Sequence, residues 1–452
     1  MSTCALHNLG CKVNSYETQA MQRMMERAGY TIVPFGEEPA DIYIINTCSV
    51  TNIADRKSRQ MIHRARKLNP DAVIVAAGCY IESAGRDVDS DVDIVIGNNE
   101  KSRLVEIIDD YRKNNAQLRL PDIAKESDFD EMELMHEGDM CWKSDDGNSH
   151  TRAYVKIQDG CNRFCSYCII PYVRGRIRSR SAADALNEIR KLAKAGCREV
   201  VLTGIHLSSY GLDKGTDGTS LIELIEMVQN VDGIERIRLG SLEPLIITEE
   251  FARRLSACTK ICPHFHLSLQ SGCDETLKRM NRRYTTAQFY SGVEILRKYF
   301  DNPAITTDVI VGFPGETEDE FAQTVEFLEK VKFYELHVFK YSRRKGTAAD
   351  RMPGQLTEKI KSERSDILLE LDDRLSADYR KSYVGKKIKV LTEENVTIDG
   401  ITYMTGFTDT YVKAAVRQKA GHEILSNRLI EVSVADYDEK KMKEMVIAVA
   451  EN

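Results

Sequence analysis

The chain has 452 residues, more than a single hydrophobic core usually holds, so we expect about three domains. Apolar residues make up 42% and charged residues 29%, which is typical of globular proteins and excludes a largely disordered chain. The net charge of −7 argues at first sight against a nucleic-acid partner, because phosphate binding depends on Lys and Arg. The N-terminus lacks a secretory leader pattern and no run of about 18 apolar residues occurs, so we expect a cytoplasmic protein that does not enter a membrane.

Short apolar runs alternate with amphipathic helical patterns from residue 3 to about residue 111. Continuous apolar strands that alternate with helices are typical of a parallel sheet covered on both faces. We therefore expect a doubly wound α/β domain at residues 1–114. The next stretch, residues 115–146, is acidic and loses this periodicity, as expected of a linker or an edge segment between domains.

The alternation resumes from residue 153 to about residue 341 with six strand-plus-helix units. Six units are too few for a closed eightfold barrel, so we expect an open, partial (β/α)6 barrel at residues 147–377. After a charged helical stretch, four segments of alternating hydrophobicity separated by Gly-containing turns follow. They predict a small all-β barrel at residues 378–445.

Three cysteines, Cys161, Cys165 and Cys168, lie within eight residues directly after the first strand of the predicted barrel. Three thiolates at this spacing can hold three irons of a four-iron cluster and leave the fourth iron open. Structural zinc sites usually have four protein ligands, and no partner Cys-x-x-Cys pair occurs elsewhere in the chain. The spacing favours an iron–sulfur cluster, with zinc as the alternative.

Cys11, Cys48 and Cys79 each follow a predicted strand of the first domain. Because the carboxyl ends of parallel strands emerge at one edge of a sheet, these thiols can converge despite their separation in sequence. We interpret them as a second three-thiolate cluster site; each alone could equally be a buried apolar Cys. The remaining cysteines are interpreted as structural: Cys4, Cys141, Cys197, Cys258, Cys262 and Cys273.

The Cys-x3-Cys-x2-Cys motif after the first barrel strand resembles the radical S-adenosylmethionine (SAM) superfamily. Together with LGCKVNSYET, NTCSVT, AGCY, LSLQSG and VGFPGET, in this order, it resembles the methylthiotransferase family over all three domains. The resemblance implies that Cys161, Cys165 and Cys168 hold a radical-generating [4Fe-4S] cluster that binds SAM. It further implies that Cys11, Cys48 and Cys79 hold an auxiliary [4Fe-4S] cluster that carries the transferred sulfur. A sulfur source and an electron donor such as flavodoxin or ferredoxin would then be partners.

The resemblance also suggests where SAM binds. Tyr167 matches an aromatic position near the adenine, although it can equally pack under its own loop. Further candidates lie at strand ends of the catalytic face, where polar groups orient ligands and a Gly turn lets the backbone approach SAM. These candidates are Ser241, Glu243, Gln270, Gly312, Pro314 and Gly315. An ordinary tight turn is the alternative for the last three.

The C-terminal barrel resembles the TRAM domain, which implies RNA binding. Basic residues beside the first cluster motif, after the last barrel strand and at the start of the TRAM-like barrel are candidates for phosphate contacts. They are Arg174, Arg176, Arg178, Arg180, Arg343, Arg344, Lys345, Lys386, Lys387 and Lys389. Structural salt bridges are the competing interpretation.

The sequences GCKVN and VFKYSRRKGT look most like the family branch that acts on threonylcarbamoyladenosine, whereas other branches tend to have Gln or Pro where Lys12 stands. We therefore predict conversion of N6-threonylcarbamoyladenosine at position 37 of tRNA to its 2-methylthio derivative. Isopentenyladenosine in tRNA and an aspartate of a ribosomal protein are alternative substrates. A non-catalytic zinc protein that binds RNA through its terminal barrel is the alternative of a different class.

Overall fold

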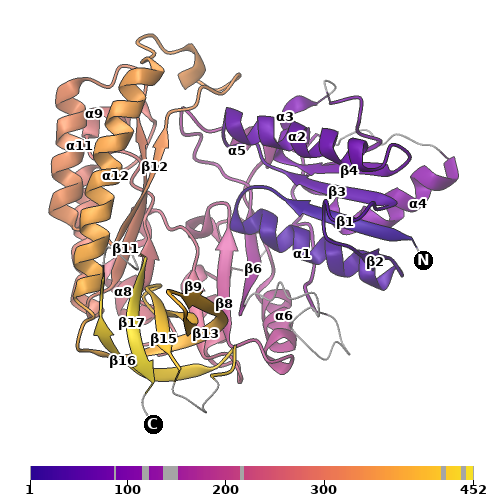
Figure 1. Cartoon of the computed structure of the whole chain (residues 1–452). Coiled ribbons are helices and arrows are strands. Elements are labelled where there is room, and N and C mark those ends of the chain that lie inside the picture. The colour runs from indigo at the N-terminus through magenta and orange to yellow at the C-terminus, as the bar shows by residue number, and fades with distance from the viewer. Residues whose placement is uncertain are drawn as a thin grey trace.

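The computed structural model describes residues 2–85, 88–114, 122–135, 151–213, 218–418, 424–438 and 444–450. Figure 1 shows three parts: an N-terminal α/β domain, a central half-open barrel, and a small β-barrel at the lower end of the central strands. This is the mixed α/β architecture that the sequence predicted. Within the described ranges no helix has the length and apolar character needed to span a bilayer.

The N-terminal sheet is parallel, with strand order β2-β1-β3-β4-β5. Its strands are β1 (Thr3–Asn8), β2 (Thr31–Ile32), β3 (Ile42–Thr47), β4 (Val73–Gly78) and β5 (Ile94–Ile96). Its helices are α1 (Lys12–Arg27), α2 (Asn52–Leu68), α3 (Cys79–Ala84) and α4 (Leu104–Asn114), the last preceded by η1 (Lys101–Arg103). Side chains of β3 alternate between the faces: Ile42 and Ile44 pack with α1 and α4, and Tyr43 and Ile45 pack with α2 and α3. The domain is therefore doubly wound.

The central domain contains six parallel strands in two adjoining sheets, with β7 added antiparallel at one edge. The strands are β6 (Arg152–Asp159), β7 (Arg178–Ser179), β8 (Glu199–Gly204), β9 (Arg236–Leu239), β10 (His264–His266), β11 (Ala304–Val311) and β12 (Glu335–Lys340). Single bridges from Ile237 to Ile261 and from Leu242 to Leu267 join the sheets. The predicted partial six-stranded barrel is confirmed.

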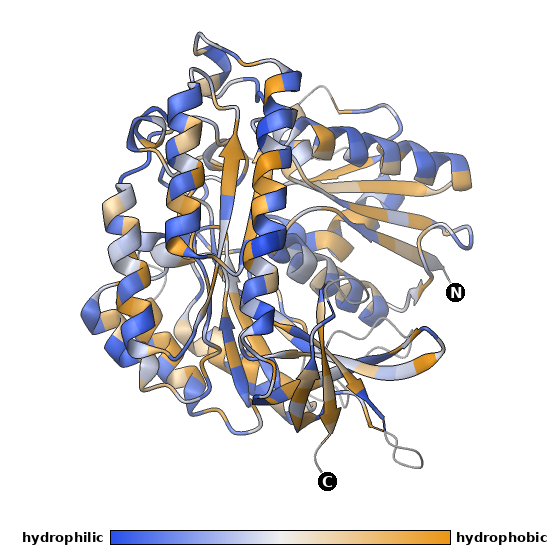
Figure 2. Cartoon of the chain, turned by 60° about the vertical axis from the view of Figure 1, so that its left-hand side comes forward, coloured by the Kyte–Doolittle hydropathy of each residue, from blue (hydrophilic) through white to orange (hydrophobic). Residues whose placement is uncertain are grey.

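Helices cover the outside of the central sheets, and Figure 2 shows that their outward faces are largely hydrophilic. The helices of the central domain are α5 (Ile170–Val173), which packs on α3, and α6 (Ala182–Lys194), α7 (Leu221–Gln229), α8 (Glu249–Ser256), α9 (Asp274–Arg279), α10 (Thr286–Tyr299), α11 (Glu318–Val331) and α12 (Glu358–Lys381), with single 3-10 turns η2 (Leu207–Ser209), η3 (Pro244–Ile246) and η4 (Ala349–Arg351). Strand residues such as Val155 and Ile237 pack in the core beneath the helices. Their neighbours in sequence, such as Lys156 and Arg238, therefore face the inner side, because side chains alternate along a strand.

The C-terminal strands form a closed barrel in the order β13-β14-β15-β17-β16. They are β13 (Lys387–Ile398), β14 (Ile401–Thr408), β15 (Lys413–Arg417), β16 (Leu429–Asp436) and β17 (Met445–Ala450). The sequence predicted four strands and a boundary at residue 445, but the fifth strand begins there and is needed for closure. The sequence analysis missed β17 because this short apolar run is not bounded by the Gly-containing turns that identified the other strands.

The predicted acidic linker is only partly a linker. Within its described residues, Met132 and Leu134 are buried in the core that also holds Tyr16 of α1. The acidic neighbours point the other way, and Glu131 pairs with Arg180 at 2.9 Å while Glu133 pairs with Lys191 at 2.8 Å. This alternation of apolar and acidic residues is that of an edge segment, which was the second interpretation of this stretch.

Candidate active site

Cys11, Cys48 and Cys79 lie at the carboxyl edge of the N-terminal sheet, after the neighbouring strands β1, β3 and β4. The strand order reverses between β1 and β3, and such a switch point is where open α/β sheets bind ligands. Burial, together with the nearby thiols of Cys79 and Cys11, raises the pKa of Cys48 to about 12. The structure thus brings the three thiols within electrostatic reach of one another.

Gly10 shows how closely the loops of this site approach. Its φ of +111° lies in the region that favours glycine, and a Cβ at this position would lie 2.9 Å from both Cβ and Sγ of Cys48. A side chain at residue 10 would therefore push the loops of Cys11 and Cys48 apart. This close packing explains why a glycine precedes Cys11 in the LGCKVN motif.

Asn14 ties the same loops together. Its side-chain amide donates to the carbonyl oxygens of Leu9 at 2.7 Å and Thr47 at 3.0 Å, and the Cys11 thiol donates to its Oδ1 at 3.7 Å. Asn14 is buried, so each of these hydrogen bonds is shielded from water.

The second cysteine set lies at the carboxyl end of β6, in the loop that leads to α5. Burial, together with the neighbouring Cys165 thiol, raises the pKa of Cys161 to about 11 and that of Cys168 to about 12. Arg282 donates from Nη1 to the Cys165 sulfur at 3.2 Å and from Nη2 to the Ser268 carbonyl at 3.1 Å. Arg282 was missed, because no motif surrounds it and only the fold brings it to the cysteine loop.

The compact three-ligand groups of the described residues contain no cysteine. Tetrahedral zinc with thiolates at about 2.3 Å holds its sulfurs about 3.8 Å apart. Among the described His, Cys, Asp and Glu residues, only two sets of three have their ligand atoms all within 4.8 Å, and neither set contains a cysteine. That each of the two sets of three thiols holds a multi-iron cluster with one open iron stays a prediction.

The two cysteine sets adjoin one another. Cys79 packs in one apolar cluster with Ile169 and Val173, which follow the last cysteine of the second set. The side-chain amide of Asn98 donates to the Cys79 sulfur at 3.7 Å and to the Val173 carbonyl at 2.7 Å, so it joins both loops. The carboxyl edge of the N-terminal sheet thus faces the mouth of the central barrel, as Figure 1 shows.

A buried network of charges fixes this arrangement. Arg174 donates to the Cys79 sulfur at 3.3 Å, to Asn14 at 2.7 Å, to Glu17 at 3.0 Å and to Asp159 at 3.0 Å. Glu17 also pairs with Lys101 and with Lys156, the latter at 2.9 Å. All these residues are almost completely buried. The network therefore links α1, the first barrel strand and the loop after the second cysteine set.

The predicted contact of Arg174, Arg178 and Arg180 with RNA is wrong, because each of these side chains is completely buried. Arg178 donates to the carbonyls of Arg174 and Arg176, and Arg180 pairs with Glu188. The acidic partners are distant in sequence, so the alternating arginines resembled a phosphate-binding run. The competing interpretation, structural salt bridges, holds here.

Arg344 is also an interior residue rather than an RNA contact, since only 5% of it is exposed. It donates to Asp55 at 2.6 Å and to Ser49 at 2.6 Å, beside the loop of Cys48. Among the remaining candidates, Arg343 is exposed but pairs with Asp350 at 2.6 Å. The other predicted RNA contacts are exposed: Arg176, Lys345, Lys386, Lys387 and Lys389.

Tyr167 packs in a small apolar cluster with Met280, Phe313 and Tyr341. This cluster joins the cysteine loop to the turn after β11. At Gly312, φ is +73° and a Cβ would lie 2.3 Å from Cγ of Lys361, so the close approach that requires glycine is to α12. Pro314 is buried and Gly315 is exposed in the same turn, and contact of this turn with SAM stays a prediction.

Ser241, Glu243 and Gln270 lie just beyond the carboxyl ends of β9 and β10, on the same side as the cysteine loop. Ser241 is exposed, whereas Glu243 is buried and accepts a hydrogen bond from Arg163 of the cysteine loop. Gln270 has φ of +73° and is 8% exposed. The structure therefore groups these three residues with Cys161, and SAM binding by them stays a prediction.

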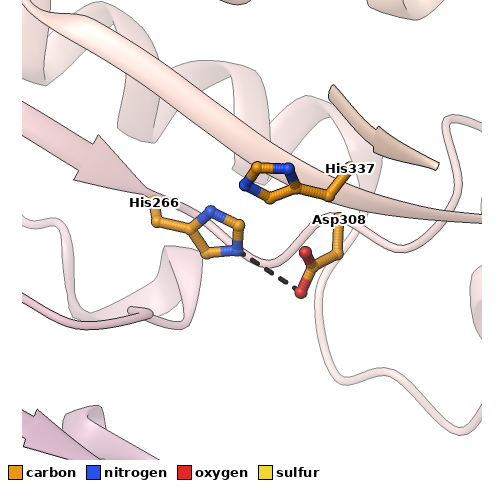
Figure 3. A group of neighbouring side chains, drawn as sticks. All are labelled: His266, Asp308 and His337. Carbon is orange, nitrogen blue, oxygen red and sulfur yellow. Dashed lines mark ion pairs between the residues drawn. The ribbon is translucent and has the colours of Figure 1, made fainter. Parts of the chain in front are cut away.

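The other predicted structural cysteines, Cys4, Cys197, Cys258, Cys262 and Cys273, are buried, while Cys141 lies outside the described residues. The inner side of the barrel carries a group that the sequence analysis missed. His266, Asp308 and His337 lie on β10, β11 and β12, with His266 Nε2 3.3 Å from Asp308 Oδ2, as Figure 3 shows. Single His and Asp residues in strands gave no motif to find them.

The C-terminal barrel covers the lower end of the inner side of the central barrel. Arg236 donates to the carbonyls of Phe407 at 2.8 Å and Lys389 at 2.7 Å, and Arg238 donates to that of Asp409 at 2.8 Å. The guanidinium of Arg238 also stacks 4.5 Å from the centre of the Tyr411 ring. The barrel is therefore docked on the central domain through charged hydrogen bonds to its backbone.

Comparison with known proteins agrees with this architecture. The Radical SAM superfamily profile matches residues 155–328, and the profile called uncharacterized protein family UPF0004 matches residues 3–97. The solved structure of the radical SAM methyltransferase TsrM from Kitasatospora setae superimposes with a TM-score of 0.55 at 17% identity and covers 77% of each chain. At this identity the likeness concerns the fold alone.

Curated relatives match nearly the whole chain. The threonylcarbamoyladenosine tRNA methylthiotransferase MtaB of Bacillus subtilis is 40% identical and covers 96% of this chain and 94% of its own. MtaB of Thermotoga maritima is 36% identical over 95% and 93% of the two chains. The tRNA-2-methylthio-N(6)-dimethylallyladenosine synthase of Acetivibrio thermocellus is 36% identical over 86% and 80%. The chain belongs to the radical SAM methylthiotransferase family and is an enzyme of the MtaB-like type.

Proposed function

We propose that this enzyme converts N6-threonylcarbamoyladenosine at position 37 of tRNA to its 2-methylthio derivative, with SAM and two [4Fe-4S] clusters. The observation that carries the proposal is the contact between two three-cysteine sets, one at a sheet edge and one at a barrel mouth. The printed names of several relatives add tRNA and threonylcarbamoyladenosine as the substrate.

Cys161, Cys165 and Cys168 would hold the cluster that binds SAM, and Cys11, Cys48 and Cys79 would hold the auxiliary cluster. When bound, these groups supply the reductive cleavage of SAM and the sulfur that is methylated and transferred. The chain contributes position and charge. Arg282 lies 3.2 Å from the Cys165 sulfur and Arg174 lies 3.3 Å from the Cys79 sulfur, so each set has a guanidinium donor that stabilises negative charge on a thiolate.

The chain would also contribute the residues that bind SAM and the tRNA. Glu243 and Gln270 at the strand ends, with Ser241, Tyr167 and the turn of Gly312, Pro314 and Gly315, would surround SAM beside the second cysteine set. Exposed cations would contact the tRNA backbone, with the barrel lysines Lys386, Lys387 and Lys389 as the principal group. An electron donor such as flavodoxin or ferredoxin and a sulfur source complete the reaction.

The test is the nucleoside profile of tRNA in a strain from which the gene is deleted and then restored. We expect mass spectrometry of digested tRNA to show loss of 2-methylthio-threonylcarbamoyladenosine, accumulation of threonylcarbamoyladenosine, and recovery on complementation. A complementing gene with Cys48→Ala should fail to restore the methylthio nucleoside. Loss of the methylthio form of isopentenyladenosine instead would transfer the assignment to that substrate, and an unchanged profile would overturn it.

A further inference from the structure

Helix α2 carries an unbalanced positive charge on its exposed side. Its 17 residues include six cations and one carboxylate, that of Asp55, whereas the whole chain has a net charge of −7. Its other side packs on the N-terminal sheet through Ile62 and Ala65, and Figure 1 shows α2 on the outside of that sheet. The exposed cations form one solvent-facing surface, the basic face of α2, which consists of Arg56, Lys57, Arg59, Arg64 and Lys67.

The basic face has no acidic partner. Among the residues that the structure describes, no carboxylate oxygen lies within 4.0 Å of any of its five cations. Two carboxylates that contact the helix pair with other residues of it, Asp89 with His63 at 2.5 Å and Asp93 with Arg66 at 2.7 Å. Several of the five cations lie three residues apart, and like charges at this spacing destabilise a helix. The helix therefore gains free energy when a row of anions binds to this face.

The beginning of α2 lies at the auxiliary cysteine site. The Ser58 hydroxyl accepts a hydrogen bond from the backbone N–H of Cys48 at 3.3 Å, which ties the helix to the Cys48 loop. The side-chain amide of Asn52, the first residue of α2, donates to the Arg343 carbonyl at 3.0 Å, in the loop that follows β12. Because α2 connects the parallel neighbours β3 and β4, it runs from this edge of the sheet back to the opposite edge. The basic face thus leads away from the place where the two domains meet.

Apolar side chains are exposed between Cys48 and the basic face. Val50 is 53% exposed and Ile53 is 58% exposed. Tyr172, on α5 after the second cysteine set, is also 53% exposed. Unpaired bases of RNA stack on aromatic and other apolar side chains. The surface therefore changes from apolar beside the cysteines to basic along α2.

An RNA stem-loop presents its groups in the same order. Its loop offers unpaired bases and its stem offers rows of phosphates. From Arg56 to Lys67 the helix rises about 17 Å at about 1.5 Å per residue. This length equals roughly five base pairs of a stacked duplex at about 3.4 Å per pair, which is a short stem. Nucleotide 37 of tRNA lies in the anticodon loop close to such a stem.

We propose that the basic face of α2 binds the phosphate backbone of the anticodon stem while the loop enters between the two cysteine sets. The proposal rests on the proposed function and assigns to the N-terminal domain a part in holding the tRNA. Contacts to phosphates fix orientation without reading the bases, so α2 acts independently of the modification at position 37. The lysines of the C-terminal barrel belong to another domain and would contact a different part of the tRNA.

An acidic electron-donor protein is the competing partner for a basic surface. Such a donor has to approach the cluster that binds SAM, which Cys161, Cys165 and Cys168 would hold. The basic face instead begins beside Cys48 of the other set and extends to the far edge of the N-terminal sheet. The exposed apolar side chains of Val50 and Ile53 also match bases better than they match a highly charged protein surface. These features favour RNA.

The test measures binding of a synthetic anticodon stem-loop, with threonylcarbamoyladenosine at position 37, to the anaerobic holoenzyme without reductant at several salt concentrations. The first variant combines Arg56→Gln, Lys57→Gln and Arg59→Gln. We expect its affinity to fall between about tenfold and about hundredfold, and the slope of log affinity against log salt to decrease by about 2 to 3. The matched control removes three exposed cations from α4 and α6 and should bind as the wild type: Lys113→Gln, Arg190→Gln and Lys194→Gln.

A second variant tests how the stem lies on the helix. Arg64→Gln with Lys67→Gln changes the end of α2 that is distant from the Cys48 loop, so it reports on RNA binding even if the first variant impairs cluster assembly. Iron content checks this. We expect the second variant to weaken binding of the full stem-loop by about fivefold and to leave binding of a stem-loop with half the stem unchanged. The first variant should weaken binding of both RNAs.

The outcomes separate the proposal from its alternatives. Wild-type affinity and salt slope in both variants would overturn it. Normal RNA binding, with turnover lost only when a protein donor replaces dithionite, would show that α2 binds the electron donor and would also overturn it. A wild type that does not convert threonylcarbamoyladenosine in the stem-loop when SAM and reductant are supplied contradicts the proposed function instead. Weaker binding by the two variants would in that case still support the contact between α2 and the stem.

Discussion

Arg174 places its Nε 3.3 Å from the sulfur of Cys79, although 95 residues separate them in sequence. The same guanidinium contacts Asn14, Glu17 and Asp159, so one side chain spans both cysteine loops and the first helix. This buried cation is therefore one of the main links between the N-terminal domain and the barrel, beside the Lys156–Glu17 ion pair.

Arg174→Lys should impair assembly of the N-terminal site. Lysine keeps the charge but cannot form the planar fork of hydrogen bonds, so we expect the free energy of unfolding to fall by about 2 kcal/mol. The iron associated with Cys11, Cys48 and Cys79 should be lost first. Urea unfolding and iron analysis measure the two effects. Arg176→Lys, two residues away but exposed, is the matched control and should behave as the wild type.

Glu17→Gln should destabilise the protein strongly at neutral pH. Burial opposes ionisation of Glu17, but Arg174, Lys101 and Lys156 outweigh it and hold its pKa well below the usual value. Neutralising this carboxyl leaves three buried cations with one anion fewer, which costs about 3–5 kcal/mol.

The lowered pKa of Glu17 determines how the stability of the protein depends on pH. Because the folded-state pKa of Glu17 is depressed, its stabilisation is fully present above the unfolded pKa and is lost as pH falls through the folded value. The stabilities of the wild type and Glu17→Gln should therefore differ most near pH 7 and converge in acid below about pH 4. Urea unfolding at several pH values measures this. A constant difference at all pH values would show that the variant acts through packing.

Cys48→Ala should remove about four of about eight irons, with SAM cleavage retained. The reason is that Cys161, Cys165 and Cys168 form a separate set on another domain. Iron content and deoxyadenosine release measure the two parts. Cys197→Ala, at a buried cysteine distant from both sets, should keep all the iron. Loss of both clusters in Cys48→Ala would show that the two sites assemble cooperatively.

Arg236→Ala should loosen the C-terminal barrel. The guanidinium donates to two backbone carbonyls of that barrel, and their loss costs about 1–3 kcal/mol of docking free energy. We expect faster amide exchange in β13 and β14 and faster proteolysis near residue 385, with the N-terminal domain unchanged. Arg417→Ala, exposed on β15, serves as control. Unchanged exchange in β13 would contradict the role of Arg236.

The double variant Lys386→Ala with Lys389→Ala should weaken tRNA binding independently of the base at position 37. Both side chains are exposed on the barrel. If each contacts a phosphate, the slope of log affinity against log salt should decrease by about 1 to 2. Binding titrations at several salt concentrations measure this, and Lys113→Ala is the control. An unchanged slope would place the RNA surface elsewhere.

The sequence by itself determined most of the helices and strands and grouped the cysteines that follow the strands. Strand periodicity and strand-end cysteines predicted both the parallel sheet and the position of Cys11, Cys48 and Cys79 at its edge, because parallel strands direct their carboxyl ends to one side. The same reasoning located Cys161 at the mouth of a six-stranded barrel. These features are local in sequence or follow from sheet geometry.

Only the tertiary structure decided the roles of the charged residues. Arg174, Arg178, Arg180 and Arg344 resembled a phosphate-binding surface, yet each is buried against other groups of the protein. Arg282 acquired its place in the same way, through packing of the residues after α9 against the cysteine loop. A charge has no periodicity that identifies its partner, so whether it faces solvent, a thiolate or a substrate depends on packing between elements that the sequence does not place.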